Sequence, residues 1–145
     1  MKQEDRKILI QDITGRIQYG VKFDFDGLVG KAIHICCYPI CNENGTDDCI
    51  CELDIFGGGG DNFIDVEYLK PYLFPLSSMT EEQKREYNSL RDFVPTYHYE
   101  YGDIVEDTEL YDNWGSIDYL IANHFDYRGL IEKGVAIDAT GLNIY

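Results

Sequence analysis

Cysteines are the first residues whose types and spacing suggest chemistry. Five of them fall between positions 36 and 51 of this 145-residue chain. A hairpin would bring four together around one metal, and thiolates suit Zn²⁺; these four are Cys37, Cys41, Cys49 and Cys51. Zinc ligands usually come as C-x-x-C pairs from tight turns, whereas the last two form C-x-C in an expected strand. We therefore expect buried, reduced thiols, with a cysteine-ligated structural zinc module as the alternative.

Other residues with catalytic potential lack the partners that catalysis needs. His34 and Cys36 would share one side of a strand, but no orienting acid follows them. The glycine run 57–60 lacks the Lys and Ser/Thr of a phosphate-binding loop. The acidic residues near Glu106 have no fixed spacing, so a solvated loop is expected there. The sequence predicts neither an enzyme nor a cofactor.

An aromatic set is the better candidate for a binding surface. Tyr97, Tyr99 and Tyr101 alternate with His98 and Glu100, which predicts an extended segment with three rings on one face. Amphipathic rings beside acidic residues are useful at protein interfaces. The competing interpretation is that these rings cover a thin core. The candidate binding residues are Tyr97, Tyr99, Tyr101 and Trp114.

Charge limits the possible partners. The chain has 27 acidic and 12 basic residues, a net charge of -15, and no Lys or Arg between positions 92 and 127. This charge would repel a phosphate backbone, so direct nucleic-acid binding is not expected. The same charge permits an alternative function, in which the protein mimics nucleic acid and inhibits a host DNA-binding enzyme.

The first half of the chain reads as one helix followed by strands. Leu9, Ile13 and Ile17 recur every four residues and predict a short helix that ends near Gly15. Strands are expected over 21–25, 32–38, 49–56 and 62–69, with a hairpin turn at Asp26-Gly27 and exposed loops between the others. These elements predict a small bent antiparallel sheet, a partial barrel.

The second half reads as mainly helical. Thr80 to Gln83 matches a capping box, so a helix should begin at Glu81, and its apolar stripe should continue through Val94 to Pro95. A loop over 103–113, a second helix capped by Ser116 and a short strand over 135–138 follow. The predicted class is α+β, with a helix and sheet lobe over 1–70, a connector over 71–79 and a helical C-terminal lobe over 80–145 packed on the first.

Two motifs carry a resemblance. They are Lys70-Pro71-Tyr72-Leu73, running on to Thr80-Glu81-Glu82, and His124-Phe125-Asp126-Tyr127-Arg128-Gly129-Leu130-Ile131. In both, the chain resembles small uncharacterised proteins of gut anaerobes and their prophages or mobile elements, and the resemblance implies no activity. No apolar run reaches the length of a signal peptide or membrane span, so we expect a cytoplasmic protein without membrane contact. The leading prediction is a non-catalytic module that binds another protein.

Overall fold

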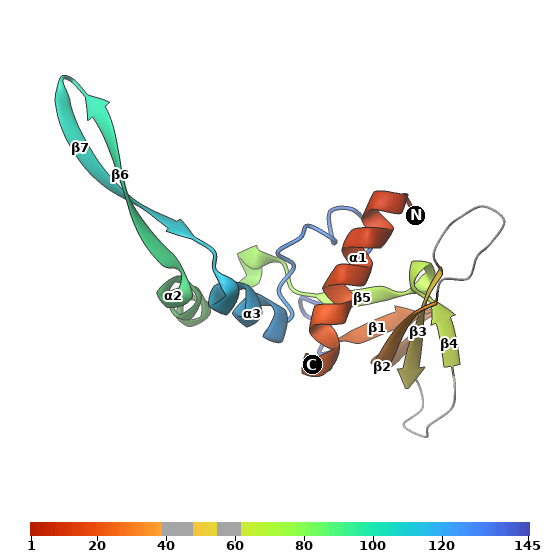
Figure 1. The fold of residues 1–145 in the computed structure, drawn as a ribbon. Coiled ribbons are helices and arrows are strands. Elements are labelled where there is room, and N and C mark those ends of the chain that lie inside the picture. The colour runs from red at the N-terminus through yellow and green to blue at the C-terminus, as the bar shows by residue number, and fades with distance from the viewer. Residues whose placement is uncertain (39–47, 55–61) are drawn as a thin grey trace. The chain divides into compact units, whose positions relative to one another are not determined.

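The computed structural model describes residues 1–38, 48–54 and 62–145, with the backbone alone over 32–38, 48–54 and 62–63. The chain forms two compact units. The first consists of Met1–Ser78 together with His124–Tyr145, and the second of Met79–Asn123. The chain is of the α+β class, as predicted, with an N-terminal helix and small open sheets (Figure 1).

Helix α1 spans Gln3–Arg16 and begins the first unit. Leu9 and Ile13, one turn apart, are fully buried and form its core-facing stripe. The helix continues through Gly15 and is followed by a 3₁₀ turn, Ile17–Tyr19. Gly20 closes this turn with a φ of 71°, a left-handed conformation that glycine adopts without steric cost. The helix therefore ends one residue beyond the predicted position.

In the described part of the first unit, six strands form one sheet in the order β4-β3-β2-β1-β5-β8. Their bounds are Lys22–Phe25 (β1), Leu28–Tyr38 (β2), Asp48–Asp54 (β3), Asn62–Asp65 (β4), Lys70–Leu73 (β5) and Ile137–Asp138 (β8). Neighbours pair antiparallel except β5 and β8, which are parallel. The strands that the structure describes form an open sheet, so the predicted partial barrel is not confirmed.

Local turn chemistry explains the first hairpin and one departure from the prediction. Asp26 and Gly27 have φ of 49° and 81° and connect the paired Phe25 and Leu28, which confirms the predicted turn. The strand expected over 62–69 ends at Asp65, whose side chain accepts a hydrogen bond from the Glu67 amide at 3.0 Å. This bond starts a 3₁₀ turn over Val66–Tyr68 and directs Val66 into the core.

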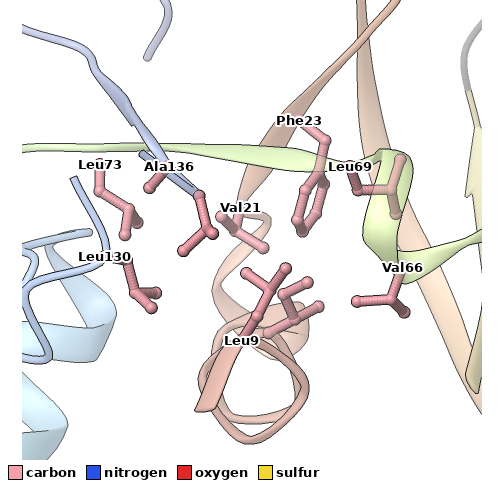
Figure 2. Close-up of a cluster of buried hydrophobic side chains, with 10 residues drawn as sticks. Leu9, Val21, Phe23, Val66, Leu69, Leu73, Leu130 and Ala136 are labelled. Carbon is pink, nitrogen blue, oxygen red and sulfur yellow. The ribbon is translucent and has the colours of Figure 1, made fainter. Parts of the chain in front are cut away.

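The core of the first unit lies between α1 and the sheet. Figure 2 shows Leu9 of α1 close to Val21 and Phe23 at β1, with Val66 and Leu69 on one side of them. The cluster is completed by Ile13, Leu73, Leu130, Val135 and Ala136. Because the last three come from the end of the chain, the C-terminal segment is part of this core.

Backbone hydrogen bonds hold residues 124–145 to the end of β5. The Phe74 amide donates to the His124 carbonyl at 2.9 Å, and the Asp126 amide donates to the Phe74 carbonyl at 2.8 Å. Further along, the Tyr145 hydroxyl donates to the Tyr72 carbonyl at 2.7 Å. The last segment, for which the sequence predicts a helical lobe, thus contributes strand β8 and turns to the first unit.

The second unit contains two helices and a hairpin (Figure 1). Helix α2, Glu81–Leu90, begins with the predicted capping box, in which Thr80 accepts from the Gln83 amide and the Gln83 side chain accepts from the Thr80 amide. Strands β6, Asp92–Glu100, and β7, Asp103–Tyr111, form a separate two-stranded sheet. Helix α3 spans Trp114–Ala122.

Three predictions for the second half are wrong. Helix α2 ends at Leu90, because Arg91 adopts extended angles (φ −81°, ψ 153°), and Val94 and Pro95 lie in β6. The segment expected to be a loop over 103–113 forms β7. Asn113, not Ser116, is the N-cap of α3, and Ser116 is the third residue of its capping box. With this hairpin in the second unit, the predicted helical C-terminal lobe is not confirmed.

Candidate functional site on the β6–β7 hairpin

The hairpin places three of the predicted binding residues, Tyr97, Tyr99 and Tyr101, on a long two-stranded ribbon. Its register runs without interruption from Asp92 opposite Tyr111 to Glu100 opposite Asp103. Tyr101 and Gly102 connect the strands with φ of 52° and 93°, the positive values that a type I′ turn requires at both positions. Tyr101 is therefore the tip of the ribbon and is fully exposed.

One face of the ribbon is rich in aromatic and aliphatic side chains. Directly opposed residues of an antiparallel pair lie on the same face, and faces alternate along each strand. The register thus defines an apolar face made of Phe93, Pro95, Tyr97 and Tyr99 from β6, opposite Leu110, Thr108, Glu106 and Ile104 from β7. Phe93, Tyr97, Tyr99 and Ile104 are 64–79% exposed. In the described chain, water covers most of this face.

The other face is acidic. It carries the carboxylates of Asp92, Glu100, Asp103, Asp107 and Glu109, together with Val94, Thr96, His98, Val105 and Tyr111. None of these five carboxylates forms an ion pair with a lysine or arginine in the part of the chain that the structure describes. The Tyr111 hydroxyl donates to Glu109, and this bond raises the pKa of Tyr111. The face therefore presents five carboxylates that no described lysine or arginine neutralises.

Polar side chains fix the base of the ribbon. Arg91 donates to the Leu110 carbonyl at 2.6 Å and forms an ion pair with Asp112 at 3.3 Å. The Asn113 amide group donates to the Leu90 carbonyl at 2.8 Å and to Asp92 at 3.0 Å. These bonds join the end of α2 to both strands, so the ribbon leaves the helices in a defined direction (Figure 1).

The two helices support this base. Tyr87 of α2 and Tyr119 of α3 stack with ring centroids 6.3 Å apart. The Tyr87 hydroxyl donates to Asp112 at 2.5 Å, and burial followed by this bond raises the pKa of Tyr87 to about 12. Tyr119 donates to Glu86 at 3.2 Å. Both hydroxyls stay protonated at neutral pH and act as hydrogen-bond donors.

The structure brings together two of the four predicted binding residues. Tyr97 and Tyr99 share the apolar face, and Tyr101 follows at the tip. Trp114, 91% exposed, begins α3 at the other end of the ribbon, which is about 30 Å from the tip at the usual rise per residue. It is therefore at the base and not beside the three tyrosines.

Sequence reasoning missed Phe93 and Ile104 as members of this face. Phe93 falls in the predicted helix and Ile104 in the predicted loop. The signal that would have identified them is the Tyr101-Gly102 turn, since a two-residue connection fixes the register of everything on either side of it. Alternation of Ile104 with acidic neighbours then identifies the second strand.

The predicted metal ligands fall mostly outside the described residues. The backbone register places Cys37 opposite Cys49, and Ile35 opposite Cys51, in β2 and β3. Cys41 and the side chains of the other four cysteines lie outside the description, and so does the side chain of His34. Among the side chains that are described, no three His, Cys, Asp or Glu residues gather at a position that could hold a metal ion.

A second concentration of titratable groups, among the side chains that the structure describes, is a buried charged cluster in the first unit. Asp12 and Arg16, four residues apart on α1, form an ion pair of 2.6 Å with no exposed side-chain surface. Arg16 also donates to the Phe125 carbonyl at 2.7 Å, and Arg128 lies 3.6 Å from Asp12. Burial raises the pKa of Asp12, although Arg16 opposes this effect. The cluster anchors the C-terminal segment to α1.

His124 lies beside this cluster under the last residue of the chain. It has a φ of 60° and stacks on Tyr145 with ring centroids 4.0 Å apart. Burial, and then the charge of Arg16, lower the pKa of His124 to about 4. The imidazole is therefore neutral at physiological pH and serves the packing of the C-terminal segment.

Comparison with known proteins adds no relative to this description. No protein-family model, no curated protein and no solved structure matches the chain. Within the described residues, no helix combines the length and the apolar composition needed to cross a bilayer.

Proposed function

We propose that this protein is a non-catalytic module of a prophage or mobile element, that it works in the cytoplasm, and that it binds another protein through the β6–β7 hairpin. The observation that carries the proposal is the apolar face, on which Tyr97, Tyr99 and Ile104 are exposed together beside the tip residue Tyr101. The origin rests on the resemblance of the 70–82 and 124–131 motifs, and the location on the expectation that the five cysteines are reduced thiols.

The exposed area suits a protein interface. An aromatic side chain buries about 150–250 Å². At their observed exposures, Phe93, Tyr97 and Tyr99 offer about 300–500 Å², and Tyr101 adds about 150–250 Å². A standard interface buries about 800 Å² on each partner. The face and tip therefore supply more than half of one partner's share.

The shape of the hairpin also favours a partner. An isolated two-stranded ribbon is marginally stable in water, because neither face packs on a core. Here both strands run nine residues and are mostly exposed. The polar network orders only the base of the hairpin. A partner that covers the outer half would therefore stabilise it.

A nucleic-acid mimic is the second candidate, and the acidic face favours it. Five carboxylates on nine paired residues give about one charge per 6 Å, taking a rise of about 3.4 Å per residue. Duplex DNA carries one charge per about 1.7 Å of axis. Because the face has roughly a third of that density, and the opposite face is apolar, protein binding through the aromatic side chains remains the leading proposal.

The test is affinity capture from a lysate of the producing cell, with the full chain as bait at low and at moderate salt. Tyr99→Ala should weaken capture of the partner by about 30-fold, which corresponds to an interface hot spot of about 2 kcal/mol. Hydrogen exchange on the complex should slow in residues 92–111. A captured protein that is retained at moderate salt and lost by this variant supports the proposal.

Tyr68→Ala is the matched control. Tyr68 lies in the first unit and is 64% exposed, comparable to the rings of the apolar face. Its replacement should leave capture unchanged. Equal capture by wild type and Tyr99→Ala would contradict the proposal, and such Tyr99-independent capture would favour the nucleic-acid mimic if it also survives at low salt alone.

A further inference from the structure

We infer that the surface which covers the apolar face belongs to a basic protein and that it places an arginine or lysine against Glu106, between the aromatic side chains. This inference rests on the proposed function and specifies the chemistry of its partner. It concerns residues of the second unit alone.

Charge decides between a basic partner and a second copy of the chain. The segment 92–111 carries six carboxylates and no lysine or arginine. Two hairpins packed through their apolar faces would bring the Glu106 carboxylates of both copies into one interface, and like charges in juxtaposition oppose association. A cationic partner is attracted by the negative potential of the hairpin, and this attraction also raises the rate of association. The charge therefore selects a heterologous, basic surface.

Glu106 determines where on the apolar face the arginine or lysine of the partner would lie. Five of the six carboxylates point to the acidic face, but Glu106 is directly opposite Tyr97 on the apolar face. Its neighbours on that face are Ile104 and Thr108, and no described residue forms a salt bridge with it. An apolar partner would desolvate this carboxylate without compensation, at a cost that a cation removes.

The aromatic neighbour determines which cation fits best. A guanidinium stacks on an aromatic ring and donates in a fork to a carboxylate, whereas an ammonium acts as a point charge. Tyr97 and Glu106 are a directly opposed pair, with Cβ atoms about 5 Å apart. One arginine side chain can therefore contact the ring and the carboxylate together.

The experiment uses the full chain and a short peptide of alternating arginine and valine, about as long as one strand. Binding is measured by fluorescence anisotropy at about 0.15 M salt, and the contacted residues are located by amide chemical shifts. Two companion peptides replace arginine with serine or valine with glycine. We expect the arginine-valine peptide to bind along residues 93–110 at least tenfold more tightly than either companion.

Variants separate this site from the general attraction of an acidic protein for cations. Glu106→Gln should weaken binding of the arginine-valine peptide about tenfold, and Tyr97→Ala should weaken it by a similar factor. Glu132→Gln makes the same charge change on an exposed residue of the first unit and should change the affinity by less than about twofold.

The outcomes are distinct from those of the capture experiment. Equal binding of the serine-valine peptide, equal effects of Glu106→Gln and Glu132→Gln, or no binding of the arginine-valine peptide would each overturn the inference of a basic partner. A dimer in sedimentation that Tyr97→Ala dissociates would overturn it as well. The proposed function itself is tested by whether capture depends on Tyr99. None of the results above changes that test.

Discussion

Removing one member of the buried Asp12–Arg16 pair should destabilise the first unit severely. In Arg16→Met, the Asp12 carboxylate loses a partner at 2.6 Å and keeps Arg128 at 3.6 Å, while the Phe125 carbonyl loses a donor at 2.7 Å. Breaking a fully buried pair by removing one partner costs about 3–5 kcal/mol. A domain of this size is stable by about 5–15 kcal/mol, so a large part of its stability is at stake.

Replacing both partners should cost much less than the sum of the single changes. Burial raises the pKa of Asp12 and the adjacent guanidinium opposes this effect, so the pair carries a desolvation cost that apolar side chains would not have. Substituting Leu for Asp12 and Met for Arg16 removes both charges and keeps most of the volume. We expect the double variant to recover about 3 kcal/mol or more relative to additivity.

The assay is urea unfolding of the four proteins of this cycle, followed by far-UV circular dichroism. Fluorescence of Trp114, the single tryptophan, reports separately on the second unit, which should be unaffected. The control is Glu81→Ala, which removes the exposed 2.8 Å pair with Lys84. Since exposed pairs contribute about 0–1 kcal/mol, this variant should change the free energy of unfolding little.

The reasoning would be refuted if Asp12→Leu and Arg16→Met each cost less than about 1 kcal/mol and the double variant equalled their sum. That result would mean that water reaches the pair and screens its charges. A Trp114 transition that shifts in each variant together with the circular dichroism transition would instead show that the two units unfold together, and the cycle would still give the coupling energy.

Two further predictions concern the ends of the two units. The pKa of His124 is lowered to about 4, against 6.5 in the unfolded chain. Between these pH values the unfolded chain binds a proton that the native state does not bind. The free energy of unfolding therefore has its full value above pH 6.5 and should fall by about 2 kcal/mol from pH 7 to pH 5. Urea unfolding of the wild type and of His124→Asn at both pH values checks this prediction. Asparagine tolerates the left-handed φ at this position, and the variant should lack the part of the pH dependence that comes from His124. Asn113→Ala removes the N-cap of α3 and the amide group that donates to Leu90 and Asp92. It should lower the free energy of unfolding of the second unit by about 1–2 kcal/mol, measured by Trp114 fluorescence during urea unfolding. An unchanged unfolding midpoint would contradict the role of Asn113 as a cap and as a donor at the base of the hairpin.

Features that depend on a few neighbouring residues were predicted well from the sequence. The capping box at Thr80 and the Asp26-Gly27 hairpin are confirmed, because each is specified by side chains or backbone angles within four residues. The short C-terminal strand is also present as β8. Its parallel pairing with β5 was not predicted, since that contact joins residues more than 60 positions apart.

The β6–β7 hairpin shows where local patterns compete. Tyr87, Leu90 and Val94 have helical spacing, whereas Tyr97, Tyr99 and Tyr101 have strand spacing, and the two patterns meet within a few residues. These two patterns do not determine the residue at which the helix ends and the strand begins. Pairing of β6 with β7, and the bonds of Arg91 and Asn113 at its base, decide that the chain leaves the helix after Leu90.

The sequence by itself determined the α+β class, the N-terminal helix, the first hairpin, the start of α2 and the excess of negative charge, because these follow from composition and short-range chemistry. Only the tertiary structure decided which tyrosines share a face, that Glu106 is among them, and that Asp12 and Arg16 are buried rather than solvated. Strand register and burial depend on segments distant in the chain, such as Phe125 for Arg16, and no local pattern contains that information.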